Sequence, residues 1–326
     1  MTATPPTIAH QTTPQTTSLL SYTSPATPLQ TLEIWLPRPL SASSLETTVW
    51  IVYIHGGAWR DPELTSSQLE PTLRRLFPAF PSFEDAGSSR AVKHIAGFAS
   101  LNYRLSPYKN HPTHPSDDRD ESRNVTHPAH VGDIAKALEW LEREYNVTGN
   151  SGQTGGARGY EWVGVGHSCG ATMLLQLVTS MGQANILSVC RPVALILLAG
   201  IYDLPVFLQN HSAPKVSTET QRVYTEIIEG AFGTDKRRWL SASPVAGDYS
   251  PETWSKGRMV VLAHSKEDEL VEEEQVNRLV EVLERQGWGV GRQLLERELK
   301  GGHDFVWEDG EQVAALIEQV TLMLFE

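Results

Sequence analysis

The chain of 326 residues is 40% hydrophobic and carries a net charge of −12, so it can bury a large core. Acidity of this size argues against nucleic acid or an anionic membrane surface as a partner. The two cysteines, Cys169 and Cys190, are too few for a disulfide framework or a zinc-binding set, which favours a reducing, cytoplasmic setting.

The N-terminal stretch is rich in Thr, Pro, Ser and Gln and has few apolar residues. This composition predicts a disordered or loosely packed arm over 1–28, followed by a single domain over 29–326. The chain has no Lys or Arg before Arg38, so no secretory or mitochondrial signal is expected. The longest apolar run, 193–201, is too short to span a bilayer.

Apolar runs and helical periodicities alternate along the rest of the chain. Strands are expected over 32–36, 49–54, 94–103, 160–165, 192–198, 258–263 and 292–299. Helices are expected over 66–77, 131–145, from just after Ser168 to Met181, 272–285 and 312–324. The connections include a glycine-rich loop, a long polar insertion and a proline-containing cap, over 149–159, 108–127 and about 204–256. This order predicts a mostly parallel sheet with helices on both faces and its chemistry at the carboxyl ends of the strands.

Between the strand at 160–165 and the following helix stands Gly166-His167-Ser168-Cys169-Gly170. A Gly-x-Ser-x-Gly in this setting predicts a sharp turn that exposes a nucleophilic serine, Ser168. Glycine is needed at both flanking positions because side chains there would collide with the turn. The alternative is an ordinary glycine-rich turn.

A serine hydroxyl needs a base, and the base needs a third group to fix its tautomer. His303 follows two glycines after the last expected strand, where a loop can return it over the sheet, and is the candidate base. The acid is expected on the loop after the strand at 258–263. Asp268 is favoured by spacing, and Glu267 and Glu269 remain alternatives. The order nucleophile, acid, base is that of α/β hydrolases.

Backbone amides must stabilise the oxyanion that develops during acyl transfer. One donor is the N–H that follows the nucleophile, that of Cys169. The others are expected from Gly56, Gly57 and Ala58, which follow the strand at 49–54 and present amides without obstruction. A plain tight turn is the alternative.

Four histidines lie in or beside the polar insertion, at His111, His114, His127 and His130. They have no regular ligand spacing on an expected helix, so neither a metal nor another cofactor is predicted.

Together these motifs resemble the α/β-hydrolase superfamily over essentially residues 30–326. The resemblance includes the esterase-like segment 102–107 (Asn-Tyr-Arg-Leu-Ser-Pro) and the His-Ser-x-x-Asp-x-x-Val run at 264–271, which assigns the acid to Asp268. The motif His55-Gly56-Gly57-Ala58-Trp59 is similar to the His-Gly-Gly-x-Trp of fungal-type kynurenine formamidases (arylformamidases). In that family the second glycine and the next residue supply oxyanion amides, implying Gly57 and Ala58.

The resemblance implies hydrolysis of the small molecule N-formyl-L-kynurenine to L-kynurenine and formate, without a cofactor, in tryptophan degradation. Aromatic residues near strand ends are candidates to cover the substrate ring, namely Trp59, Tyr202, Phe305 and Trp307. The insertion at 108–127 and the cap depart from the family pattern, and the sequence leaves open whether the chain forms a homodimer.

Two other functions compete with this reading. The first is a carboxylesterase of the hormone-sensitive-lipase-like group, although those enzymes usually have a third glycine where Ala58 stands. The second is a non-catalytic hydrolase fold that binds a ligand as a receptor, which the complete set of Ser168, Asp268 and His303 argues against.

Overall fold

A computed structural model describes residues 15–83, 88–147, 159–179 and 191–326. In these segments, eight strands form one twisted sheet in the order β1-β2-β4-β3-β5-β6-β7-β8. Strands β3 to β8 are parallel, whereas β1 and β2 join the edge antiparallel. The strands are β1 (Gln15–Ser21), β2 (Thr31–Leu36), β3 (Val49–Ile54), β4 (Ile95–Leu101), β5 (Glu161–His167), β6 (Ala194–Leu198), β7 (Met259–Ser265) and β8 (Gln293–Leu299).

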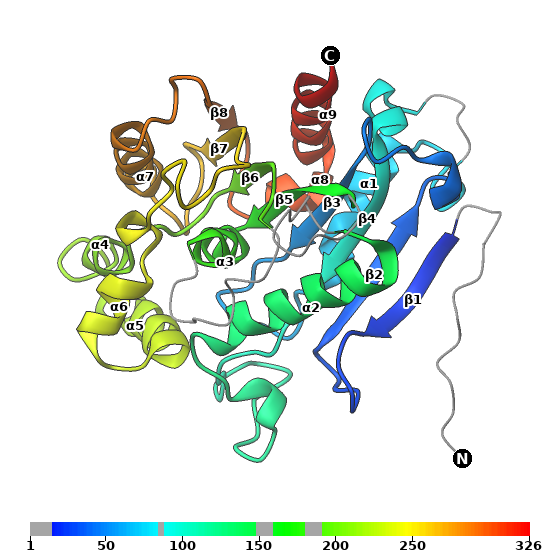
Figure 1. Cartoon of the computed structure of the whole chain (residues 1–326). Helices are drawn as coiled ribbons and strands as arrows, with labels where there is room; N and C mark the ends of the chain where they lie inside the picture. Colours follow the sequence, from blue (N-terminus) through cyan, green and yellow to red (C-terminus); the bar gives the residue numbers. More distant parts are fainter. Residues whose placement is uncertain (1–14, 84–87, 148–158, 180–190) are drawn as a thin grey trace.

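Helices cover both faces of the sheet, which confirms the predicted fold class (Figure 1). The α-helices are α1 (Glu70–Leu76), α2 (Ala129–Tyr145), α3 (Cys169–Val178), α4 (Leu204–Asn210), α5 (Thr218–Phe232), α6 (Lys236–Ala242), α7 (Glu274–Arg285), α8 (Phe305–Asp309) and α9 (Glu311–Phe325). Single 3-10 turns are η1 (Leu40–Ala42), η2 (Ser66–Leu69), η3 (Arg90–His94), η4 (Glu121–Arg123) and η6 (Pro244–Ala246).

The residue alternation of β3 explains the two layers of helices. All six residues of this strand are buried, and successive side chains point to opposite faces. Trp50, Val52 and Ile54 belong to the core shared with α2, α3 and α7. The intervening Val49, Ile51 and Tyr53 belong to the core shared with α1 and α9. A strand covered on both faces reads as a continuous apolar run, as this one does.

The expected N-terminal arm over 1–28 is wrong for its second half. Residues 15–21 form β1 and pair with β2, with a register shift between Thr17 and Leu20. Tyr22 is buried, and its hydroxyl donates to the carbonyl of Asn102 at 2.9 Å. An edge strand with one exposed face can be rich in polar residues, so a polar composition does not distinguish β1 from a disordered arm. Residues 1–14 lie outside the described residues.

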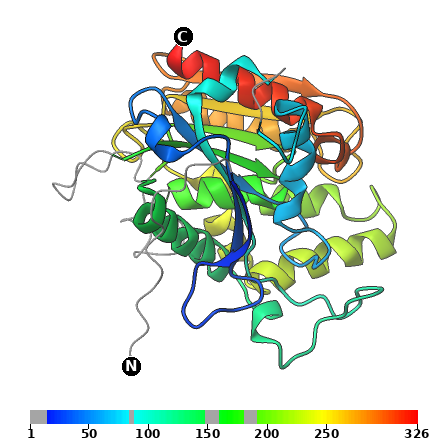
Figure 2. The same ribbon diagram turned by 90° about the vertical axis from the view of Figure 1, so that its right-hand side faces the viewer.

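The expected cap over 204–256 contains α4, α5, α6 and η6, and its yellow-green and yellow helices lie together to one side of the sheet (Figure 2). The insertion at 108–127 is an irregular loop apart from η4. Almost all of the glycine-rich loop at 149–159 and the expected helix end near Met181 lie outside the described residues.

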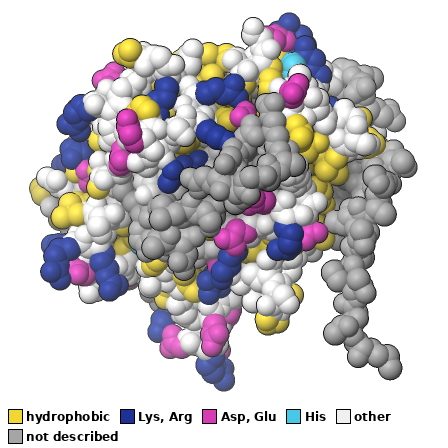
Figure 3. Space-filling view, viewed as in Figure 1, with side chains coloured by type: hydrophobic (Ala, Val, Ile, Leu, Met, Phe, Trp, Pro, Cys, Tyr) yellow, Lys and Arg dark blue, Asp and Glu magenta, His cyan; other side chains and the backbone are white. Residues whose placement is uncertain are grey.

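On the face seen in Figure 3, Lys and Arg side chains are interspersed with Asp and Glu. None of the described helices combines the length and the hydrophobicity that crossing a lipid bilayer requires.

Candidate active site

Ser168 stands in the sharp turn between β5 and α3, with φ 54° and ψ −123°. A non-glycine residue rarely adopts a positive φ, and the cost is sustained by packing around it. A Cβ on Gly170 would lie 2.2 Å from the carbonyl oxygen of Ile54, and one on Gly166 would lie 2.6 Å from the amide nitrogen of Ala171. Gly170 therefore lets the turn lie directly against the end of β3, and Gly166 lets the end of β5 lie against the first turn of α3.

Asp268 and His303 lie at the carboxyl ends of the neighbouring strands β7 and β8. The Nδ1–H of His303 donates to the Asp268 carboxylate at 2.8 Å, and both side chains are buried. With its proton on Nδ1, a neutral His303 leaves Nε2 as a proton acceptor. Ser168 and His303 line the same cavity. The structure gives no hydrogen bond between them in the described residues, and such bonds often form only with substrate present.

Asp268 is held as a carboxylate by its surroundings. Burial raises the pKa of Asp268, whereas the hydrogen bond and the charge of His303 lower it. The amides of Val271 and Leu270, each 2.9 Å from the carboxylate, lower it further, so the net pKa is below its ordinary value.

The two other acids of the loop contact backbone rather than imidazole. Glu267 accepts a hydrogen bond from the amide of Gly301 at 2.7 Å, and Glu269 accepts one from the amide of His303 at 3.1 Å. The three consecutive acids thus all contact the histidine loop, and only Asp268 reaches the ring.

The turn after β3 places its amides beside Ser168. Gly57, Ala58 and Trp59 have φ values of 102°, 49° and 60°. Gly57 and Ala58 line the cavity with Ser168, whereas the Trp59 amide donates to the sulfur of Cys169 at 3.3 Å. Burial raises the pKa of the Cys169 thiol to about 11, outweighing these donors, so the sulfur is a neutral structural group.

Residues of the segment 102–107 support this turn. The hydroxyl of Tyr103 donates to the carbonyls of His55 and Gly56, each at 3.0 Å, and its ring stacks on the His55 imidazole. Arg104 makes a two-pronged ion pair with the fully buried Asp133 of α2, at 2.7 and 2.8 Å. Sequence reasoning missed Asp133, and a lone acid on the apolar face of the 131–145 helix was the signal that pointed to it.

The cavity beside Ser168 has a volume of about 280 Å³. Its walls come from the turn after β3, the insertion, the cap and the acid and base loops. They comprise Gly57, Ala58, Arg60, Asp61, Leu64, Tyr108, Ser168, Ile201, Phe207, Val223, Tyr224, Ile227, Leu270, Val271, His303 and Asp304. A larger open depression of about 940 Å³, bounded by residues such as Pro37 and Phe83, contains none of the site residues.

The four aromatic residues expected to cover the substrate do not line this cavity. Trp59 is buried against the edge of Phe232, and Tyr202 is fully buried. Phe305 is exposed, and Trp307 donates its indole N–H to Asp304. The aromatic wall consists instead of Tyr108, Phe207 and Tyr224. Position near a strand end did not reveal which way each side chain points.

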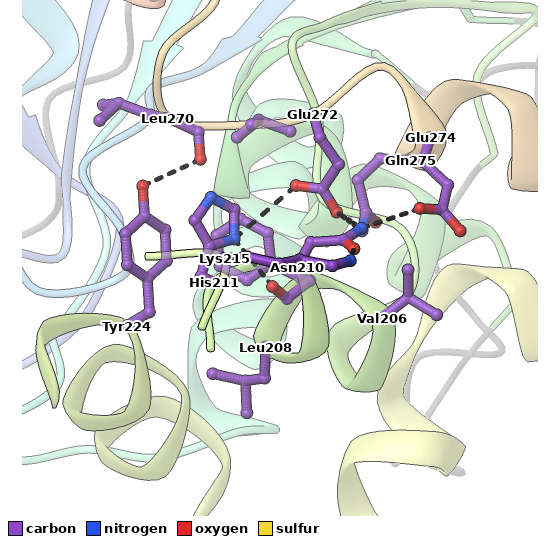
Figure 4. Close-up of polar contacts among 12 residues, drawn as sticks. Val206, Leu208, Asn210, His211, Lys215, Tyr224, Leu270, Glu272, Glu274 and Gln275 are labelled. Carbon is purple, nitrogen blue, oxygen red and sulfur yellow. Dashed lines mark hydrogen bonds and ion pairs between the residues drawn. The ribbon is translucent and has the colours of Figure 1, made fainter. Parts of the chain in front are cut away.

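Tyr224 ties the cap to the loop that carries Asp268 (Figure 4). Its hydroxyl donates to the carbonyl of Leu270 at 3.1 Å, and its ring stacks on His211 at 3.8 Å between centroids. Asn210 donates to Glu272 at 3.0 Å beside this stack. These contacts fix the cap wall of the cavity in place.

Two groups of side chains could offer several metal ligands. Glu63, from the loop after β3, lies close to His111 and His114 of the insertion, and His303 lies near His167 and Asp304. In the first group, His111 Nδ1 already accepts from the amide of His114 at 2.9 Å. In the second, His303 Nδ1 is bonded to Asp268 and His167 Nε2 donates to the carbonyl of His303. In each group, therefore, hydrogen bonds within the protein already occupy at least one histidine nitrogen that a metal ion would need.

Sequence comparison matches residues 51–316 to the family model described as alpha/beta hydrolase family. The chain is 31% identical over 292 residues to the kynurenine formamidase-like hydrolase fscH of Fusarium equiseti, covering 89% of this chain and 88% of that protein. It is 29% identical over 282 residues to the kynurenine formamidase avaC of Aspergillus versicolor, covering 81% and 85%.

Among solved structures, esterase B from Lactobacillus rhamnosis superposes with a TM-score of 0.59 at 14% identity, covering 97% of this chain and 88% of that one. An esterase from Pyrobaculum calidifontis superposes with a TM-score of 0.56 at 17% identity, covering 91% and 82%. At such identities the likeness concerns the fold alone.

Proposed function

We propose, because this chain belongs to the alpha/beta hydrolase family and is similar to kynurenine formamidases, that it hydrolyses N-formyl-L-kynurenine to L-kynurenine and formate. The observation that carries the proposal is one cavity lined by Ser168, Gly57, Ala58 and a histidine held by a buried aspartate. The similarity to kynurenine formamidases suggests the substrate. The arrangement of Ser168, His303 and Asp268 supports hydrolysis through a serine nucleophile.

In the first half of the reaction, Ser168 Oγ attacks the formyl carbon while Nε2 of His303 takes the hydroxyl proton. Asp268 stabilises the imidazolium that results. The amides of Gly57, Ala58 and Cys169 stabilise the negative oxygen of the tetrahedral intermediate. His303 then delivers its proton to the aryl nitrogen, the C–N bond breaks, and the amine leaves with the formyl group on Ser168.

In the second half, His303 removes a proton from water, which attacks the formyl ester. The tetrahedral intermediate collapses, the proton returns to Ser168 Oγ, and formic acid leaves and ionises to formate in solvent. His303 performs every proton transfer, so the cycle calls for no cofactor. An aniline is a better leaving group than an alkyl amine, which suits serine chemistry.

The test compares turnover of N-formyl-L-kynurenine with that of short p-nitrophenyl esters. We expect the formamide to be cleaved with the higher kcat/KM. Ester hydrolysis without formamide cleavage would assign the chain to the carboxylesterases instead.

A second measurement separates a reactive enzyme from a silent scaffold. A fluorophosphonate probe should label the wild type and should fail to label Ser168→Ala. Absence of labelling in a folded wild type would favour the ligand-receptor alternative.

A further inference from the structure

Arg60 follows the oxyanion turn directly and forms part of the wall of the cavity that contains Ser168. The amides of Arg60 and Asp61 both donate to the carbonyl of Gly57 at 2.9 Å, which closes the turn. The conformation that presents Gly57 and Ala58 to the nucleophile therefore also fixes the backbone from which the arginine extends.

The guanidinium of Arg60 is buried without an ion pair. The residue is 6% exposed, and the guanidinium carbon lies 3.9 Å from the ring centroid of Tyr108. Its polar partner is the side chain of Tyr108, and no carboxylate of the described residues forms an ion pair with it. A buried charge without an ion-pair partner is costly, whereas guanidinium is well suited to bind a carboxylate through two parallel hydrogen bonds.

Neighbouring carboxylates have other partners. Glu226, whose charge acts on Arg60, forms an ion pair with Arg222 at 2.6 Å. Asp61 accepts from the amide of Glu63 at 2.9 Å and lies 3.5 Å from His111. Asp304 accepts from the indole of Trp307 at 2.9 Å. The acids beside the cavity thus leave the donors of Arg60 to a ligand.

Comparison with other arginines argues against a purely structural stack. Arg292 lies over Trp288 at the same 3.9 Å, but it also donates to the carbonyl of Tyr249 at 2.9 Å. Arg104 is satisfied by Asp133. Arg60 shares the aromatic stack of Arg292, but among the described residues it has neither a carbonyl acceptor like that of Arg292 nor a carboxylate like that of Arg104.

The remainder of the cavity is mainly apolar where the cap and the acid loop face it. Those side chains are Ile201, Phe207, Val223, Ile227, Leu270 and Val271. An aromatic leaving group fits this wall, and one buried cation beside it would select a negative charge on the same molecule.

We propose that Arg60 binds a carboxylate on the leaving group of the substrate, so that the site prefers anionic formamides and esters over their neutral counterparts. The inference rests on the proposed function for the identity of the leaving group, an aryl amine bearing an amino-acid side chain. Arg60 is then a specificity residue whose guanidinium is positioned by the ring of Tyr108 from the insertion.

The experiment measures kcat/KM for wild type, Arg60→Gln and Arg60→Lys on N-formyl-L-kynurenine and on its methyl ester. We expect Arg60→Gln to lose about 10- to 100-fold on the carboxylate and less than about threefold on the methyl ester. Arg60→Lys should recover part of the loss. The control is Arg74→Gln, since Arg74 is exposed and lies 5.1 Å from the ring centroid of Phe80, away from the cavity.

A second substrate pair, 3-(2-acetoxyphenyl)propanoate and its methyl ester, separates this inference from the proposed function. If the wild type cleaves only the esters, the formamidase assignment fails. The role of Arg60 is then tested by comparing kcat/KM for the charged and the neutral acetoxy ester. Equal losses of Arg60→Gln on charged and neutral substrates, or no loss on either, would overturn the role of Arg60. Should Arg60→Gln fail to fold, a wild-type preference for the carboxylate below about threefold would overturn it as well.

Discussion

Replacing Asp268 with Asn tests the arrangement of the three acids on the loop after β7. The substitution preserves shape but removes the charge that faces Nδ1 of His303 at 2.8 Å. The carboxylate also accepts the amides of Leu270 and Val271, and an Asn side chain, with one oxygen, cannot accept all three hydrogen bonds.

The expected loss is large because two effects add. A hydrogen bond to a charged group contributes about 1.5–3 kcal/mol. An Asn that presents its NH₂ to the ring would also favour the tautomer with the proton on Nε2, which cannot act as a base. Together we expect kcat to fall about 10³- to 10⁴-fold, equivalent to about 4–5.5 kcal/mol.

The matched controls are Glu267→Gln and Glu269→Gln. Each keeps a side-chain oxygen for the backbone amide it accepts from, so kcat should stay within about threefold of wild type. Steady-state kinetics on N-formyl-L-kynurenine and thermal melting of all three variants form the assay. A loss below tenfold for a folded Asp268→Asn, or a larger loss for either control, would refute the assignment of the acid.

Other consequences follow from packing and burial. Gly170→Ala should lower the free energy of unfolding by at least about 2 kcal/mol in urea titrations, because its Cβ would meet backbone at 2.2 Å. Gly230→Ala, whose Cβ would have only an ordinary contact at 3.7 Å, should be neutral or slightly stabilising, and similar losses for both would contradict the reasoning. Asp133→Ala should cost about 3–5 kcal/mol by the same assay, since it leaves Arg104 unpaired; a loss under 1 kcal/mol would show the pair to be dispensable. Burial lowers the pKa of five described histidines, to about 4 for His55 and His127, to about 3 for His130 and His167, and below its ordinary value for His264. Because the unfolded chain then binds more protons below about pH 6.5, stability should fall by up to about 1.4 kcal/mol per pH unit for each of them as pH drops toward 4. Constant stability over that range would contradict their burial as neutral rings.

The sequence by itself determined the features that depend on local pattern. Continuous apolar runs identified the buried parallel strands, and Gly166 and Gly170 around Ser168 identified the strained turn, because only glycine fits positions so close to backbone. The alternation of strands and helices then placed the candidate residues at one edge of the sheet.

Only the tertiary structure decided what depends on side-chain direction and on contacts between distant segments. Three neighbouring acids are equivalent in composition, yet the path of the loop turns Asp268 to the ring and Glu267 and Glu269 to backbone. Likewise, Trp59 points into the core while Tyr224 forms the cavity wall, because rotation about the chain and packing of the cap set these directions. Spacing along the chain carries no such information when the partners are 34 or more residues apart.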